Sequence, residues 1–224
     1  LLARFVSELG ADRIDYLLAD REFIGEDWFK YLIEAKINFV IRVKSNIWVD
    51  VEGIKVKSSK LFKQVNQDGM LSYNVKIDEV ALQMQATRST ENDLVIVVSN
   101  RLSEPNLLVI YAKRWRIECL FANLKSKGFN LEDTHFTAKD RIGNLTKLIV
   151  LALTICYLIG LVKASYKPIM LKKHGYKQSS FFRYGYDLLI QKLNNNLYDA
   201  IKLISLCISY LPMEVKCKKL ISVM

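Results

Sequence analysis

Apolar residues in the first part of the chain recur in short runs that predict alternating helices and strands. The runs predict a helix, a strand, a second helix and a second strand, over residues 1–9, 14–19, 28–35 and 38–43 in turn. Asp20 follows the first strand directly, and Asp27 precedes the second helix as a candidate cap. Phe29, Leu32 and Ile33 fall on one face of that helix, which we expect to point inward. The order strand, helix, strand predicts an α/β layer with parallel strands.

The pattern changes over residues from about 44 to 93, where short runs are separated by Gly53, Gly69 and polar turns. These runs cover residues 47–49, 54–56, 71–77 and 80–86. They predict hairpins, in a mostly antiparallel insertion carried between two parts of the main sheet. Residues 94–99 would return the chain to that sheet.

The second half of the chain has helical spacing. We expect helices over roughly residues 140–162, 181–193 and 198–210. Residues 148–162 carry no charged side chain, but this stretch of 15 residues is shorter than the roughly 20 that span a bilayer. It predicts a buried core helix, with membrane insertion as the alternative.

Composition narrows the possible functions. The 224 residues carry a net charge of +10, which suits a polyphosphate partner such as nucleic acid. Four cysteines without a CxxC spacing and only two histidines give no zinc-site pattern and no disulfide framework. This cysteine usage favours the reducing cytoplasm.

One line of sequence carries candidate chemistry: Tyr111, Arg114, Glu118 and Lys125 stand at offsets 0, 3, 7 and 14. On one continuous helix, at about 100° per residue, these side chains fall within an arc of roughly 60°. A carboxylate flanked by two cations and a phenol can hold a metal ion and phosphates together. The alternative is that Arg114 and Glu118 form an ordinary i,i+4 pair on a solvated helix.

This spacing resembles the Tyr-Arg-Glu-Lys signature of the DDE-type insertion-sequence transposases, in the insertion sequence four branch. Residues 124–129 and 131–135 look like the same family. The segment 17–23, with the Phe-Ile-Gly that it leads into, resembles the family's stretch around its second catalytic aspartate, which would be Asp20. The alternative for Asp20 is that it merely ends a strand and caps a turn.

The resemblance implies an α/β fold: a partial RNase H-like core over residues 1–165, with a β-rich insertion at about 44–93, and a helical basic region over 166–224. It implies that Asp20 and Glu118 are catalytic and bind Mg²⁺ (or Mn²⁺). Tyr111, Arg114 and Lys125 would contact DNA phosphates. The implied partners are double-stranded DNA with terminal inverted repeats and a second copy of the chain in a synaptic complex. The implied location is the bacterial cytoplasm, at the nucleoid and away from membranes.

A DDE enzyme uses three acids, and the family's first aspartate lies on a strand that would precede Leu1. Asp12 and Asp15 stand only eight and five residues before Asp20, too close to replace it. We therefore expect a C-terminal fragment that lacks the first catalytic aspartate. Two functions remain open: metal-dependent cleavage and strand transfer at transposon ends, or an inactive remnant that only binds DNA or a full-length partner.

Overall fold

The computed structural model describes residues 1–67, 69–125, 128–173 and 175–209, which form two compact units. The first unit contains Leu1–Cys119, and the second begins at Leu120, inside a helix. The first unit is built on a β-sheet and the second on helices. Residues 210–224, the end of the predicted basic region, lie outside the described residues.

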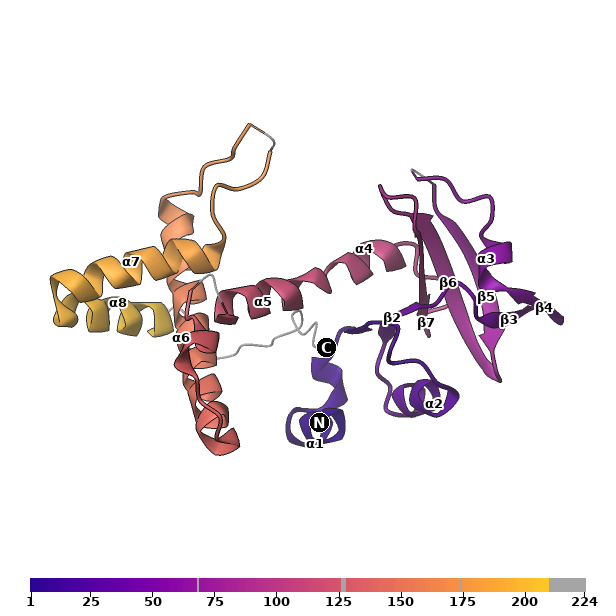
Figure 1. The fold of residues 1–224 in the computed structure, drawn as a ribbon, viewed down its shortest axis with the longest axis horizontal. Coiled ribbons are helices and arrows are strands. Elements are labelled where there is room, and N and C mark those ends of the chain that lie inside the picture. Colours follow the sequence, from indigo (N-terminus) through magenta and orange to yellow (C-terminus); the bar gives the residue numbers. More distant parts are fainter. Residues whose placement is uncertain (68, 126–127, 174, 210–224) are drawn as a thin grey trace. The chain divides into compact units, whose positions relative to one another are not determined.

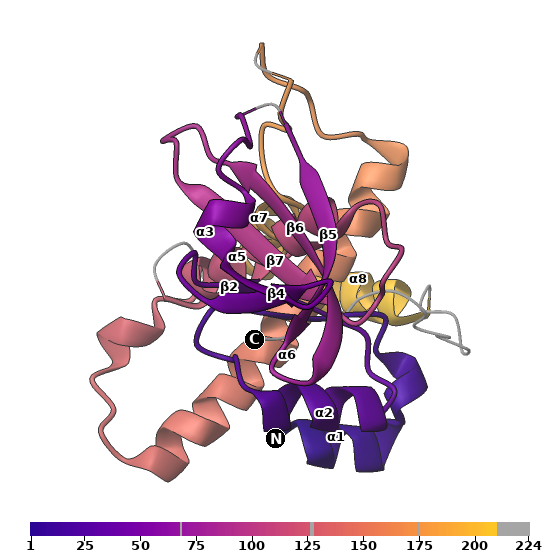
Figure 2. The same ribbon diagram turned by 90° about the vertical axis from the view of Figure 1, so that its right-hand side faces the viewer.

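A mixed sheet of seven strands, counted over the described residues, forms the centre of the first unit, and Figure 2 shows β5, β6 and β7 side by side. Its order is β1-β2-β7-β6-β5-β3-β4, with β1 and β2 parallel and the other neighbours antiparallel. The strands are β1 (Leu17–Ala19), β2 (Phe39–Val43), β3 (Trp48–Val51), β4 (Ile54–Lys57), β5 (Leu71–Ile77), β6 (Val80–Arg88) and β7 (Leu94–Ser99). The parallel pair confirms the predicted strand–helix–strand unit.

The predicted hairpins are present as β3–β4 and β5–β6. The first turns at Glu52 and Gly53, which both have positive φ (52° and 87°), as a two-residue turn between twisted strands requires. The Asp50 carboxylate accepts a hydrogen bond from the Gly53 N–H at 2.8 Å and fixes this turn. β7 then returns between β2 and β6, so the hairpins extend the same sheet.

Helices cover both faces of the sheet, and Figure 1 shows α3 and α4 on opposite sides of β6 and β7. Leu17 and Ala19 of β1 belong to the larger core cluster, together with side chains of three helices, while Leu18 packs on the other face with α4. This alternation is the two-residue period of a strand. The helices of this unit are α1 (Leu2–Leu9), η1 (Ala11–Arg13), α2 (Glu26–Glu34), α3 (Ser58–Leu61) and α4 (Leu107–Ala112).

Two details predicted for α2 were wrong. The helix begins at Glu26 with Gly25 as its N-cap, so Asp27 lies in the first turn, where its charge favours the helix N-terminus. Phe29 and Leu32 are fully buried as predicted, but Ile33 is 40% exposed. A helix that packs on a sheet by one narrow stripe leaves the edge of its apolar face in solvent.

The second unit is held together by close contact between long helices. At Gly160 an added Cβ would lie 1.9 Å from the Phe181 carbonyl oxygen, and at Gly185 it would lie 1.8 Å from that of Cys156. Only glycine therefore allows α6 and α7 to approach in this way. The helices are the last part of α5 (Trp115–Lys125), which begins in the first unit, and then η2 (Leu131–Thr134), α6 (Lys139–Tyr166), α7 (Phe181–Asn195) and α8 (Leu197–Ser209). Tyr210, the predicted end of the last helix, lies outside the described residues.

The prediction of a buried core helix holds for only one side of α6. Ile149, Cys156 and Ile159 are buried, while Leu148 and Leu151 are 65% and 58% exposed. The reason is that α7 and α8 pack on α6 within this unit. By length and composition alone, α6 could also cross a membrane.

Candidate active site

The carboxyl ends of the parallel strands β1 and β2 bring a carboxylate and a cation to one place. The register pairs Leu18 with Val40 and Ala19 with Ile41, so the next position sets Asp20 beside Arg42. Leu18 and Val40 face α4, and side chains two residues further along a strand return to the same face. We therefore place Asp20 and Arg42 on the α4 side of the sheet.

Asp20 begins a tight turn directly after β1. One of its carboxylate oxygens accepts a hydrogen bond from the Arg21 N–H at 2.8 Å, and its carbonyl accepts one from the Phe23 N–H at 3.0 Å. Asp20 thus has the turn-capping role that the sequence left open. Its side chain is half-buried, and the hydrogen bond engages only one of its two carboxylate oxygens.

Helix α4 adds Tyr111 above this end of the sheet. Tyr111 is 9% exposed, and its ring packs in a cluster with Leu18 and Val40. Its hydroxyl is buried and makes no well-formed hydrogen bond with a described residue, although the Arg114 guanidinium interacts with it. Burial raises the pKa of Tyr111; Asp20 acts in the same direction, and the cations of Arg114 and Arg42 oppose it. The phenol therefore stays protonated at neutral pH and remains able to donate a hydrogen bond.

The single continuous helix predicted for the signature line is interrupted. α4 ends at Ala112 and α5 begins at Trp115. Across the break, the N–H of Arg114 bonds to the carbonyl of Tyr111, three residues back, at 2.8 Å. This tight turn still leaves the Arg114 guanidinium near the Tyr111 ring, with 5.6 Å between the guanidinium carbon and the ring centroid.

Arg114 interacts electrostatically with both acids, Asp20 and Glu118. Its Nη2 donates a hydrogen bond to Glu118 Oε1 at 2.8 Å, with the Arg114 side chain 19% exposed and that of Glu118 38% exposed. Burial by itself lowers the pKa of Arg114, but Glu118, Tyr111 and Asp20 outweigh it, so the pKa is raised. The Arg114 Nε is buried and has no hydrogen-bond partner among the described residues. The cation is thus permanent, and one of its donors is unused.

The first unit therefore brings together Asp20, Tyr111, Arg114 and Glu118, four of the five residues singled out in the sequence. The fifth, Lys125, ends α5 with an exposed side chain and belongs to the second unit. Sequence reasoning missed Arg42, which acts on the Tyr111 hydroxyl. The sequence placed Arg42 in the predicted strand 38–43. Only the pairing register of β2 with β1 shows that it lies beside Asp20.

Comparison with known families decides the class of protein. Residues 1–155 match a family model described as the transposase DDE domain, which covers more than half of the chain. The chain belongs to the DDE transposase family. A search of curated proteins finds no match. DDE transposases act on DNA at transposon ends and generally use divalent metal ions.

Asp20 and Glu118 are the type of ligand that such an ion binds, but they are only two of the three acids that a DDE enzyme uses. Carboxylate oxygens are the ligands that Mg²⁺ and Mn²⁺ prefer, and Asp20 and Glu118 both interact with Arg114 of this transposase domain. No group of three or more His, Cys, Asp or Glu side chains that could hold a metal ion occurs in the part of the chain that the structure describes.

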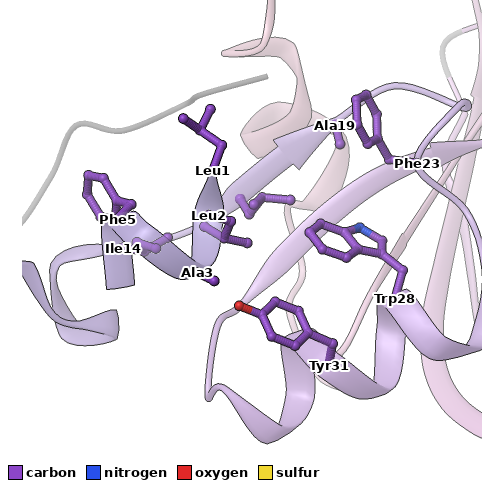
Figure 3. Close-up of a pocket in the computed structure, with 10 residues that line it drawn as sticks. Leu1, Leu2, Ala3, Phe5, Ile14, Ala19, Phe23, Trp28 and Tyr31 are labelled. Carbon is purple, nitrogen blue, oxygen red and sulfur yellow. The ribbon is translucent and has the colours of Figure 1, made fainter. Parts of the chain in front are cut away.

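An apolar cavity of this transposase domain, of about 420 Å³, lies beside the edge strand β1. Figure 3 shows Leu2 and Phe5 of α1 and Trp28 and Tyr31 of α2 around it. Its described lining residues include no carboxylate, lysine, arginine or histidine. This cavity therefore contains none of the candidate site residues.

Proposed function

We propose that the chain acts in DNA transposition by metal-dependent cleavage and strand transfer at transposon ends, as a member of the insertion sequence four branch. The supporting observation is a pair of buried polar atoms, the Tyr111 hydroxyl and the Arg114 Nε, for which no described residue supplies a well-formed hydrogen bond. Their side chains interact with each other and with the Asp20 carboxylate. A buried polar atom without a partner costs about 1–3 kcal/mol. A phosphate oxygen that accepted hydrogen bonds from both donors would recover this cost.

The reaction class is phosphoryl transfer, in which a water or a 3′-hydroxyl oxygen bonds to phosphorus as the bond to the leaving oxygen breaks. Asp20 and Glu118 would hold the divalent ion, Mg²⁺ or Mn²⁺. Such an ion, when bound, activates the attacking oxygen and stabilises the leaving one.

Arg114 would serve two partners in this scheme. Its Nη2 holds the Glu118 carboxylate in place, and its Nε can donate to a phosphate oxygen of the bound strand. The protonated Tyr111 hydroxyl would donate beside it, and Lys125 would add a point charge along the DNA. These contacts position the backbone without reading its sequence.

A DDE site takes three acids, and we propose Asp20 as the second and Glu118 as the third in chain order. The pair of acids also supports an alternative function, binding of DNA or of a transposase partner without cleavage. The two functions differ in one readout, metal-dependent nicking of duplex DNA by this polypeptide.

We also propose that two copies pair at the two inverted repeats, in the cytoplasm and at the nucleoid. Apolar side chains on the surface of α8 support pairing, since Leu197, Ile201 and Ile208 are each more than half exposed. Sedimentation of the purified chain with and without duplex DNA tests this proposal. A chain that stays monomeric in both conditions would contradict it.

Substitution of Asp20 or Glu118 in the full-length transposase tests the cleavage chemistry. We expect Asp20→Asn and Glu118→Gln each to abolish strand cleavage at the inverted repeat while duplex binding is kept. Glu22→Gln is the matched control, because Glu22 lies two residues from Asp20 with a side chain 75% exposed. Retained cleavage by either variant would remove that residue from the catalytic set.

A further inference from the structure

We infer that a basic pocket at the carboxyl ends of β1 and β2 binds a DNA backbone phosphate, separate from those held by Tyr111 and Arg114. This inference rests on the proposed function, since it adds a contact to the same DNA. The pocket has a volume of about 380 Å³ and is lined by Arg21, Arg42, Val43, Lys44, Ser45, Asn46 and Leu94.

The charge of this pocket is of one sign. Three of its described lining residues are cations, Arg21, Arg42 and Lys44, and none is acidic. Arg42 is half-buried, yet neither Arg42 nor Lys44 makes a side-chain hydrogen bond or ion pair with any residue that the structure describes. Arg21 has only a loose, exposed pair with Glu22 at 3.9 Å. Asp20 stands beside Arg42 in the strand register, but the described residues form no ion pair with this guanidinium. A partly desolvated guanidinium that makes no ion pair favours an incoming anion.

The rim of the pocket is held in place before any ligand arrives. Ser58 is fully buried, and its hydroxyl lies 3.4 Å from the Lys44 carbonyl oxygen and 2.8 Å from that of Ser45. The Ser58 N–H also donates to the Ile47 carbonyl at 2.9 Å. These bonds fix the backbone that carries Lys44 and Asn46, so little conformational entropy is lost on binding.

The pocket adjoins the candidate active site through Arg42. In the parallel register Arg42 follows Ile41 as Asp20 follows Ala19, and the Arg42 charge acts on the Tyr111 hydroxyl. The exposed Arg21 and Lys44 spread positive charge over an open surface. A chain of phosphates suits such a surface better than a single enclosed anion does. A strand whose phosphate contacts Arg114 could therefore place a further phosphate at Arg42.

The number of such phosphate contacts can be measured from how steeply DNA binding by the whole chain weakens as salt is added. Fluorescence anisotropy with a labelled duplex gives the slope of log K against log salt between about 50 and 200 mM, and each lost phosphate contact lowers its magnitude by about 0.9. We expect that decrease for Arg42→Gln and for Lys44→Gln. Arg4→Gln is the matched control: it removes one charge from α1, on the opposite face of the sheet, with a side chain 81% exposed.

The outcomes separate this inference from the proposed function. If the wild type does not bind the duplex, both are wrong. If Arg114→Gln lowers the slope while both pocket variants match Arg4→Gln, only the pocket inference is wrong. Lys44 is exposed, so its variant keeps the test valid should Arg42→Gln fail to fold.

A second measurement distinguishes DNA phosphate from free phosphate. We expect sodium phosphate and sodium chloride of equal sodium concentration to weaken duplex binding by the same factor. Stronger competition by inorganic phosphate that disappears in Arg42→Gln, with an unchanged salt slope for DNA, would make the pocket a small-anion site and overturn the inference.

Discussion

The Arg114 guanidinium carbon lies 5.6 Å from the centre of the Tyr111 ring, and each of these side chains keeps one buried polar atom without a hydrogen bond to a described residue. Tyr111 lies at the end of α4, and Arg114 lies in the break before α5. Folding has therefore left two donors unused at the place where Asp20 and Glu118 interact with Arg114. This stability cost is typical of sites whose missing partner is a ligand.

Tyr111→Phe should separate the stability of the free chain from its affinity for DNA. Removing a buried hydroxyl that has no partner should raise the free energy of unfolding by about 1 kcal/mol. The same change should weaken duplex binding about tenfold, because a donor to phosphate is lost. Denaturant unfolding and fluorescence anisotropy measure the two effects.

Tyr198→Phe is the control for this experiment, since its ring is 69% exposed and lies in α8. It should leave both quantities unchanged. A Tyr111→Phe chain that is less stable than the wild type would mean that the hydroxyl has a partner in the free protein, and the argument for a phosphate there would fail.

Prediction from the sequence succeeded where the pattern was local. The runs 71–77 and 94–99 match β5 and β7 residue for residue, because a short alternating or continuously apolar run between turns defines a strand without distant information. Arg42 could not be found this way, since its place beside Asp20 depends on the pairing of two strands about twenty residues apart. The break at Lys113 and Arg114 was also missed. Both residues are good helix formers, so only tertiary contacts could reveal it.

The buried thiol of Cys156 should make the helical unit sensitive to alkali. Burial raises the pKa of Cys156 to about 11 from an ordinary 9.0, so the folded state holds its proton more tightly than the unfolded state. The stabilisation is complete below about pH 9 and is lost as the pH rises through 11, because the unfolded chain then releases the proton first.

Thermal unfolding followed by circular dichroism between pH 8 and pH 11 measures this effect. The midpoint of the wild type should fall more steeply than that of Cys156→Ala, by the equivalent of roughly 2 kcal/mol at the alkaline end. Cys119→Ala, at an exposed position, should keep the wild-type slope. Equal slopes for wild type and Cys156→Ala would show that the thiol is not buried in the folded protein.

Two glycines of the same helical unit should respond in opposite ways to alanine. At Gly185 a Cβ would lie 1.8 Å from the Cys156 carbonyl oxygen, and backbone cannot yield as a side-chain tip can. Gly185→Ala must therefore push α6 and α7 apart, and we expect the free energy of unfolding to fall by 3 kcal/mol or more, roughly the upper range for overpacked cores.

Gly143 lies in α6 with open space around it. Gly143→Ala should stabilise the unit by about 0.5–1 kcal/mol, because alanine favours a helix interior. Denaturant unfolding of both variants measures the difference, and a Gly185→Ala chain as stable as Gly143→Ala would refute the close packing of these two helices.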